Sequence, residues 1–318
     1  MYLGRFANIL RISWAFCLGP SILGVGCSTV SAHKNCSSQE AVISEDWTRN
    51  PPPLWATRPL PVYILNNNKD APPVGTARPA ILLLHELPGM TPECLRLGTN
   101  LAAHGFTVYL PLMFGRPGAP SSALSIMWRL IALSFSSKWH VYEKAHTSPI
   151  VNDLKRIREE IVQRHGRVGV IGMCLTGAFP LALLEDQGVT AVVLSQPATP
   201  FMRITSAQRA ALSISEDDLE RAKRRVFRDN LEILGLRFAS DNLCQAERFE
   251  NLKDQFGTNF TDLTISLSDH PLRAHSVLCG DYDNTPMSAT RVRFECVLSY
   301  LDKRFDTKVS NGANSGSY

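Results

Sequence analysis

One segment constrains the fold more than any other: a short β-branched run that passes through a glycine-rich turn into an apolar helix. The run covers residues 167–171, and the turn is Gly172-Met173-Cys174-Leu175-Thr176-Gly177. Small residues favour such a turn because its strained backbone presents one side chain at the tip. Unpaired N–H groups at the start of the following helix favour a thiolate. The pattern therefore predicts a cysteine nucleophile, Cys174, at a strand-to-helix elbow.

Two further polar residues follow predicted strands later in the chain. Asp241 comes after the apolar run that begins at Leu231, and His275 lies in a loop after the short run 263–267. The chain order of Cys174, Asp241 and His275 is nucleophile, acid and base, which is typical of an α/β hydrolase. These three residues are therefore the candidate catalytic triad.

Other residues could take the same parts. His270 is the alternative base, and Asp229 is the alternative acid, although Asp229 precedes its strand instead of following it. Asp269 and Asp281 are interpreted as loop acids.

Glu86 is a fourth candidate. It follows the apolar run 80–84 and His85, and a helix is predicted from Pro92 to His104. An acid beside a buried strand is costly unless it is hydrogen-bonded or functional. We interpret Glu86 as an active-site residue and His85 as a hydrogen-bonded histidine of the core.

With these motifs the chain resembles the dienelactone hydrolase family of the α/β-hydrolase fold, over roughly residues 55–305. That family has a His-Glu or Gln-Glu pair after an early strand, a Gly-x-Cys-x-Gly elbow, an aspartate after a later strand, and His-Ser near the end. The resemblance implies an α/β fold with a doubly wound, mostly parallel sheet and helices on both faces. Alternating strand and helix patterns from about residue 80 onward favour the same class.

The resemblance also implies a role for each candidate residue. Cys174 would be the nucleophile and His275 the base. Asp241 would be the acid that orients the base, and Glu86 the carboxylate that contacts the resting thiol. The backbone N–H groups of Leu87 and Leu175 would form the oxyanion hole. The implied activity is hydrolysis of an ester or lactone through a thioester acyl-enzyme.

The sequence departs from the family at two positions. Thr176 replaces the second elbow glycine, and Cys279 stands where dienelactone-cleaving members have an arginine that binds the substrate carboxylate. A second family arginine, expected within residues 125–145, has no clear counterpart. These departures argue against dienelactone itself as substrate. They also leave an alternative function, a non-catalytic binding protein for small molecules with the same fold.

Composition limits the other functions. The chain has 318 residues, 44% of them hydrophobic, and a net charge of +4 without a basic cluster, so nucleic acid is not expected as a partner. The absence of a Cys-x-x-Cys motif or histidine cluster gives no reason to expect a metal or another cofactor. A small ester or lactone is the expected partner, and the oligomeric state stays open.

The ends of the chain predict a simple domain organisation. Residues 1–32 are interpreted as a signal or targeting segment, 33–54 as a linker, 55–305 as the hydrolase domain and 306–318 as a disordered tail. The apolar run 12–25 favours export, but a transit peptide or a misplaced start fits as well, and eight cysteines favour a reducing compartment such as the cytoplasm. Residues 123–135 could form a cap over the site or pack as an ordinary helix.

Overall fold

The computed structural model describes residues 47–50, 60–66, 79–119, 148–185, 187–199, 204–266, 268 and 274–306. All of them belong to one compact unit, residues 39–318. The expected signal segment, most of the expected linker, residues 123–135, His270, Asp269 and nearly all of the expected tail lie outside the described residues.

Eight strands of the described chain form a single sheet in the order β1-β2-β4-β3-β5-β6-β7-β8. Their bounds are β1 Trp47–Asn50, β2 Val62–Leu65, β3 Ala80–Leu84, β4 Thr107–Pro111, β5 Val168–Met173, β6 Val189–Ser195, β7 Ile233–Phe238 and β8 Phe260–Ile265. Strands β1 and β2 pair antiparallel at one edge, and all pairs from β4 to β8 are parallel. Strand β1 lies within residues 33–54, where the sequence predicted a linker.

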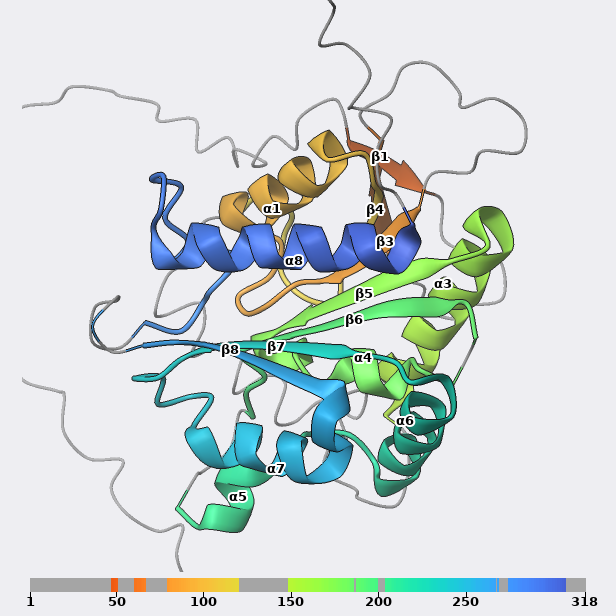
Figure 1. Ribbon diagram of the computed structural model, residues 1–318. Coiled ribbons are helices and arrows are strands. Elements are labelled where there is room, and N and C mark those ends of the chain that lie inside the picture. The colour runs from red at the N-terminus through yellow and green to blue at the C-terminus, as the bar shows by residue number, and fades with distance from the viewer. Residues whose placement is uncertain are drawn as a thin grey trace, which may run out of the picture. The chain divides into compact units, whose positions relative to one another are not determined.

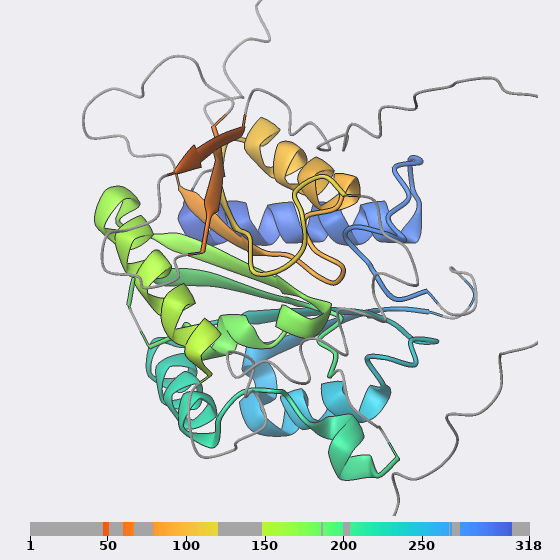
Figure 2. The same cartoon turned by 180° about the vertical axis from the view of Figure 1, so that it is seen from behind.

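Helices cover both faces of this sheet (Figures 1 and 2). Helices α1 (Pro92–Ala103) and α8 (Ala289–Phe305) pack on one face. The other face is covered by α3 (Pro149–His165), α4 (Phe179–Ala182), α6 (Glu216–Asp229) and α7 (Ala246–Phe256), with α5 (Ser206–Ala210) beside α7. Two short 3₁₀ turns follow β5 and α7, at Cys174–Thr176 and Gly257–Asn259. The predicted α/β class, with a mostly parallel sheet and helices on both faces, is confirmed.

The central strands are apolar on both faces because helices cover both sides. In β3, Ile81 and Leu83 face the layer of α1 and α8, whereas Leu82 and Leu84 face the layer of α3 and α4. All five residues of β3 are buried. A continuous apolar run, and not an alternating one, is therefore the sequence pattern of these strands.

The helix predicted from Pro92 to His104 is α1, which ends one residue earlier, at Ala103. The side chain of Thr91 caps α1 by accepting a hydrogen bond from the N–H of Cys94 at 3.3 Å. Gly166 ends α3 with a positive φ of 73°. None of the described helices is long and apolar enough to cross a membrane.

The parallel strands bring their carboxyl ends to one edge of the sheet. Ligand and catalytic sites of such folds lie at this edge, in the loops that leave the strands. Here the loops after β3, β5, β6, β7 and β8 carry Glu86, Cys174, Gln196, Asp241 and His275.

Candidate active site

The elbow after β5 has the strained backbone that the sequence predicted. Cys174 adopts a positive φ of 53°, which is unusual for a residue with a side chain. A Cβ atom on Gly172 would lie 2.4 Å from the carbonyl oxygen of Thr176, and one on Gly177 would lie 2.4 Å from Cα of Pro197. The two glycines therefore allow the chain to turn tightly enough to present the cysteine.

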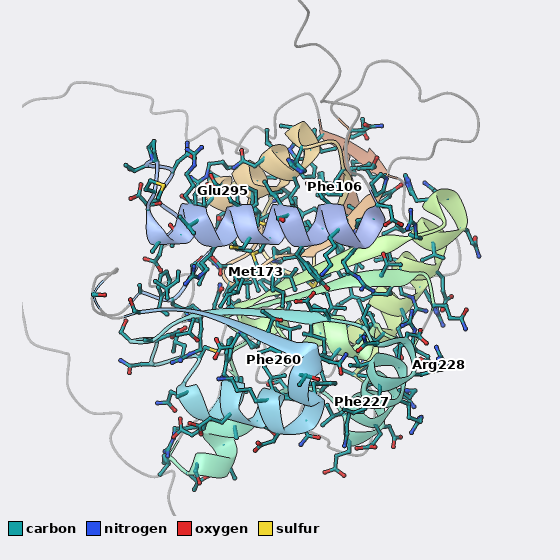
Figure 3. The ribbon with its side chains drawn as sticks, viewed as in Figure 1. Phe106, Met173, Phe227, Arg228, Phe260 and Glu295 are labelled. Atoms are coloured by element: carbon teal, nitrogen blue, oxygen red, sulfur yellow. The ribbon has the colours of Figure 1, made fainter. Side chains whose placement is uncertain are left out.

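The elbow accommodates the β-branched side chain of Thr176 because that side chain is fully buried and hydrogen-bonded there. The hydroxyl oxygen accepts a hydrogen bond from the N–H of Met173 at 3.2 Å, and it lies 3.0 Å from the carbonyl oxygen of Leu84, to which it can donate. Thr176 thus ties the turn to the neighbouring strand β3. Met173, labelled in Figure 3, is buried in the layer that contains α1 and α8.

Asp241 and His275 form a hydrogen-bonded pair. The Oδ2 atom of Asp241 lies 2.7 Å from Nδ1 of His275, while Oδ1 accepts the N–H groups of Leu243 and Cys244 at 2.7 and 3.1 Å. Because Asp241 is almost fully buried and accepts at Nδ1, a neutral imidazole has its proton on Nδ1. Nε2 is then the basic atom.

Cys174 lies close enough to His275 to shift the pKa of its imidazole. Nε2 is buried and has no hydrogen-bond partner among the described residues. Burial lowers the pKa of His275, but the nearby charge of Cys174 and the hydrogen bond with Asp241 outweigh burial, so the pKa lies well above its usual value. The structure therefore brings Cys174, His275 and Asp241 together.

Glu86 is buried beside this triad. Its Oε1 accepts a hydrogen bond from the hydroxyl of Ser276 at 2.5 Å, and its Oε2 accepts from Nε2 of Gln196 at 3.0 Å. Among the described residues no hydrogen bond joins Glu86 to the thiol of Cys174, although the resemblance implied that contact. Burial raises the pKa of Glu86, the charge of Asp281 adds to the rise, and the hydrogen bonds and the charge of His275 oppose it.

Three residues of this network were not singled out as functional by the sequence: Gln196, Ser276 and Asp281. Gln196 directly follows β6, has a positive φ of 33° and is fully buried. Ser276 follows His275. A polar residue at the carboxyl end of a buried strand was the available signal for Gln196. Asp281 accepts hydrogen bonds from the N–H groups of His275 and Ser276, and no sequence signal indicated that contact.

Of the alternative acid and base, Asp229 lies away from the site, and His270 lies outside the described residues. Asp229 lies at the C-terminal end of α6, where it pairs with Arg225 and Arg228, so it stands at the opposite end of β7 from Asp241. Figure 3 labels Arg228 on the same helix. His85 is a core histidine, as predicted: it is fully buried, and Nε2 accepts the N–H of Met113 at 3.0 Å.

Leu87 and Leu175 carry the N–H groups that the resemblance assigns to the oxyanion hole. The N–H groups of Leu87 and Leu175 donate none of the turn and loop hydrogen bonds found in the described part of the chain.

Cys279 is fully buried, with its sulfur 3.6 Å from Sδ of Met173, so its side chain supplies no charge to a bound substrate. The described residues contain no group of three metal-ligating side chains.

Comparison with known proteins agrees with this architecture. The solved structures that match include a protein from Klebsiella pneumoniae assigned as a dienelactone hydrolase, with a TM-score of 0.54, 15% identity, and coverage of 77% of this chain and 94% of that one. A dienelactone hydrolase from Anabaena variabilis matches with a TM-score of 0.51, 13% identity, and coverage of 81% and 99%. No curated protein sequence matches significantly.

The sheet, the elbow and these structural matches define an α/β hydrolase. The family model for the dienelactone hydrolase family matches residues 68–301, so the chain belongs to that family. It is a hydrolase that acts on esters or lactones.

Proposed function

We propose that this hydrolase cleaves its ester or lactone through covalent catalysis by Cys174. The observation that carries the proposal is the Asp241–His275 pair, 2.7 Å apart, whose basic Nε2 lies next to a thiol on a positive-φ elbow. A thiol is a strong nucleophile only when a neighbouring base takes its proton, and His275 is that base.

The reaction has two halves. In the first, Nε2 of His275 takes the thiol proton, the sulfur of Cys174 attacks the carbonyl carbon, and the N–H groups of Leu87 and Leu175 bind the oxyanion. The imidazolium returns the proton to the leaving alkoxide, and a thioester remains. In the second half His275 activates water, which attacks the thioester carbonyl and releases the carboxylic acid and the thiol.

Asp241 supports both halves by holding the imidazole in one tautomer and by stabilising the imidazolium. Glu86 is a buried carboxyl beside the triad, and its hydrogen bond with Ser276 helps to hold the loop that carries His275. No metal or organic cofactor takes part in this proposed scheme.

The proposal is tested with a small activated aryl ester. Cys174→Ala is expected to abolish turnover while the fold persists, and Cys174→Ser is expected to retain little activity because a hydroxyl has a much higher pKa. Cys296→Ala, which removes another half-buried free cysteine from α8, is the matched control and should leave turnover unchanged. Wild-type rates for Cys174→Ala would refute the nucleophile.

The base and its acid are tested in the same assay. His275→Ala should lower kcat by about 10²-fold or more, and Asp241→Asn by less, because Asp241 acts through the imidazole. Asp229→Asn should change kcat little. A protein that binds the ester without turnover, and whose Cys174 resists alkylation, would instead be the non-catalytic binding protein.

A further inference from the structure

We infer that Asp281 is a positioning residue that aligns His275 with the thiol of Cys174. This inference rests on the proposed function, because it assigns to Asp281 a part in the same site. No sequence pattern distinguishes Asp281 from other loop acids, and the family match assigns it no role.

The carboxylate of Asp281 holds the backbone of the histidine loop. Its Oδ2 atom accepts hydrogen bonds from the N–H groups of His275 and Ser276, both at 2.8 Å. The backbone N–H of Asp281 in turn donates to the carbonyl oxygen of Ser276 at 2.9 Å. These three bonds close the segment from His275 to Asp281 into one turn around a single carboxylate.

Two carboxylates therefore fix His275 from opposite ends. Asp241 holds Nδ1 of the imidazole, and Asp281 holds the backbone N–H of the same residue. With both ends held, the direction of Nε2 toward Cys174 is determined. Misplacement of a reacting group by about 1 Å can cost on the order of 10²-fold in rate, so this alignment matters for turnover.

The same turn links the histidine to Glu86. The hydroxyl of Ser276 accepts the N–H of Gly280 at 2.7 Å and donates to Oε1 of Glu86. Since Asp281 fixes the N–H of Ser276, loss of its carboxylate would loosen the contact with Glu86 as well. Among the described residues, Glu86 interacts electrostatically with Asp281, His275 and the thiol of Cys279.

Asp283 shows that an acid in this loop need not serve the site. Its Oδ1 atom accepts the N–H and the hydroxyl of Thr285, at 2.8 and 2.6 Å, whereas the N–H groups of His275 and Ser276 donate to Asp281. Asp283 is therefore a matched control, because it has the same chemistry two residues further along the chain.

The test compares Asp281→Ala, Asp281→Asn and Asp283→Asn in the full chain. Alkylation of Cys174 by iodoacetamide, followed by peptide mapping from pH 5 to 9, reports the reactivity of the thiol without any need for hydrolysis. We expect Asp281→Ala to alkylate roughly tenfold more slowly at neutral pH and to lose about 10- to 100-fold in kcat with little change in KM. Asp281→Asn should recover part of both, because its amide oxygen still accepts hydrogen bonds.

Asp283→Asn should match the wild type in both measurements. A folded Asp281→Ala variant with the wild-type alkylation profile and kcat would overturn the inference. If that variant does not fold, a wild-type profile for Asp281→Asn and for Asp281→Ser would overturn it equally. The two proposals fail in different ways. Wild-type hydrolysis by Cys174→Ala would refute Cys174 as the nucleophile. The alkylation profiles would still report whether Asp281 aligns His275.

Discussion

Glu86 is a carboxyl on which burial and hydrogen bonding act in opposite directions, and burial prevails. Its pKa lies above the ordinary value of 4.5. Between 4.5 and that raised pKa the folded protein keeps the proton and the unfolded chain loses it, so the free energy of unfolding falls as pH rises through this window. In Glu86→Gln the side chain cannot ionise, and its amide oxygen can still accept a hydrogen bond from Ser276 or Gln196.

The stability of Glu86→Gln relative to the wild type is therefore expected to increase as pH rises from about 4.5, and then to level off. Urea unfolding at a series of pH values measures this difference. Glu250→Gln, which changes an exposed acid on α7, is the control and should give no such trend. A constant difference across the series would show that folding does not raise the pKa of Glu86.

Cys279 bears on which substrates the site accepts. The resemblance implies an arginine at this position in dienelactone-cleaving members, and with the buried thiol of Cys279 there a substrate carboxylate would lose one charge-assisted partner, which contributes on the order of 1.5–3 kcal/mol. Neutral esters or lactones should have a kcat/KM roughly tenfold or more above that of carboxylated analogues of the same size. The test measures kcat/KM for a neutral substrate and for its carboxylated analogue of the same size. A preference for the carboxylate would point to another arginine, and Arg116 and Arg129 would be the first to replace.

At the scale of elements, the elbow depends on one hydroxyl. Thr176→Val keeps the shape of the side chain but leaves the N–H of Met173 without its acceptor, and an unsatisfied buried group costs about 1–3 kcal/mol. We expect a loss of that size in the free energy of unfolding. Thr190→Val is the matched control, because the hydroxyl of Thr190 is buried without a partner among the described residues. An equal loss in both variants would show that the bonds of Thr176 contribute nothing.

Local pattern was enough to locate the strands and helices that frame the site. The buried run 80–84 is β3, the helix predicted from Pro92 is α1, and the run after Leu231 contains β7. Each is defined by apolar periodicity and by a residue that starts or ends it, and both are local properties. Strand β1 was missed because only its pairing with β2 makes four residues a strand.

The contacts within the site were less accessible to sequence reasoning. The chain order of Cys174, Asp241 and His275 gave candidates because each follows a strand. The partners of Glu86 could not be predicted, since Gln196 and Ser276 are distant in sequence and meet Glu86 only after the sheet has formed. Long-range side-chain geometry of this kind depends on the packing of the complete fold.

At the scale of the whole molecule, the position of β1 sets where the folded unit must begin. Trp47 is 7% exposed, and its indole ring comes within 2.7 Å of where a Cβ on Gly98 of α1 would lie. A chain that begins at residue 39 keeps this packing, and a chain that begins at residue 55 loses it. Removal of a buried tryptophan costs about 3–5 kcal/mol.

We therefore expect the chain that begins at residue 39 to be more stable than the one that begins at residue 55 by about that amount. Denaturant unfolding of the two shortened chains measures the difference, and Trp47→Ala in the full chain should reproduce most of it. Equal stability would place the start of the domain near residue 55, as the sequence predicted.

The pairing of β3 with β5 joins residues far apart in the chain, since Ala80 pairs with Val168. A chain emerging from the ribosome contains Glu86 and Cys174 long before it contains His275. In the proposed mechanism an incomplete chain has a thiol without its base, so it cannot cleave the esters around it. Turnover then begins only after synthesis has passed the histidine loop, and an activity assay would report the completion of the chain as well as its folding.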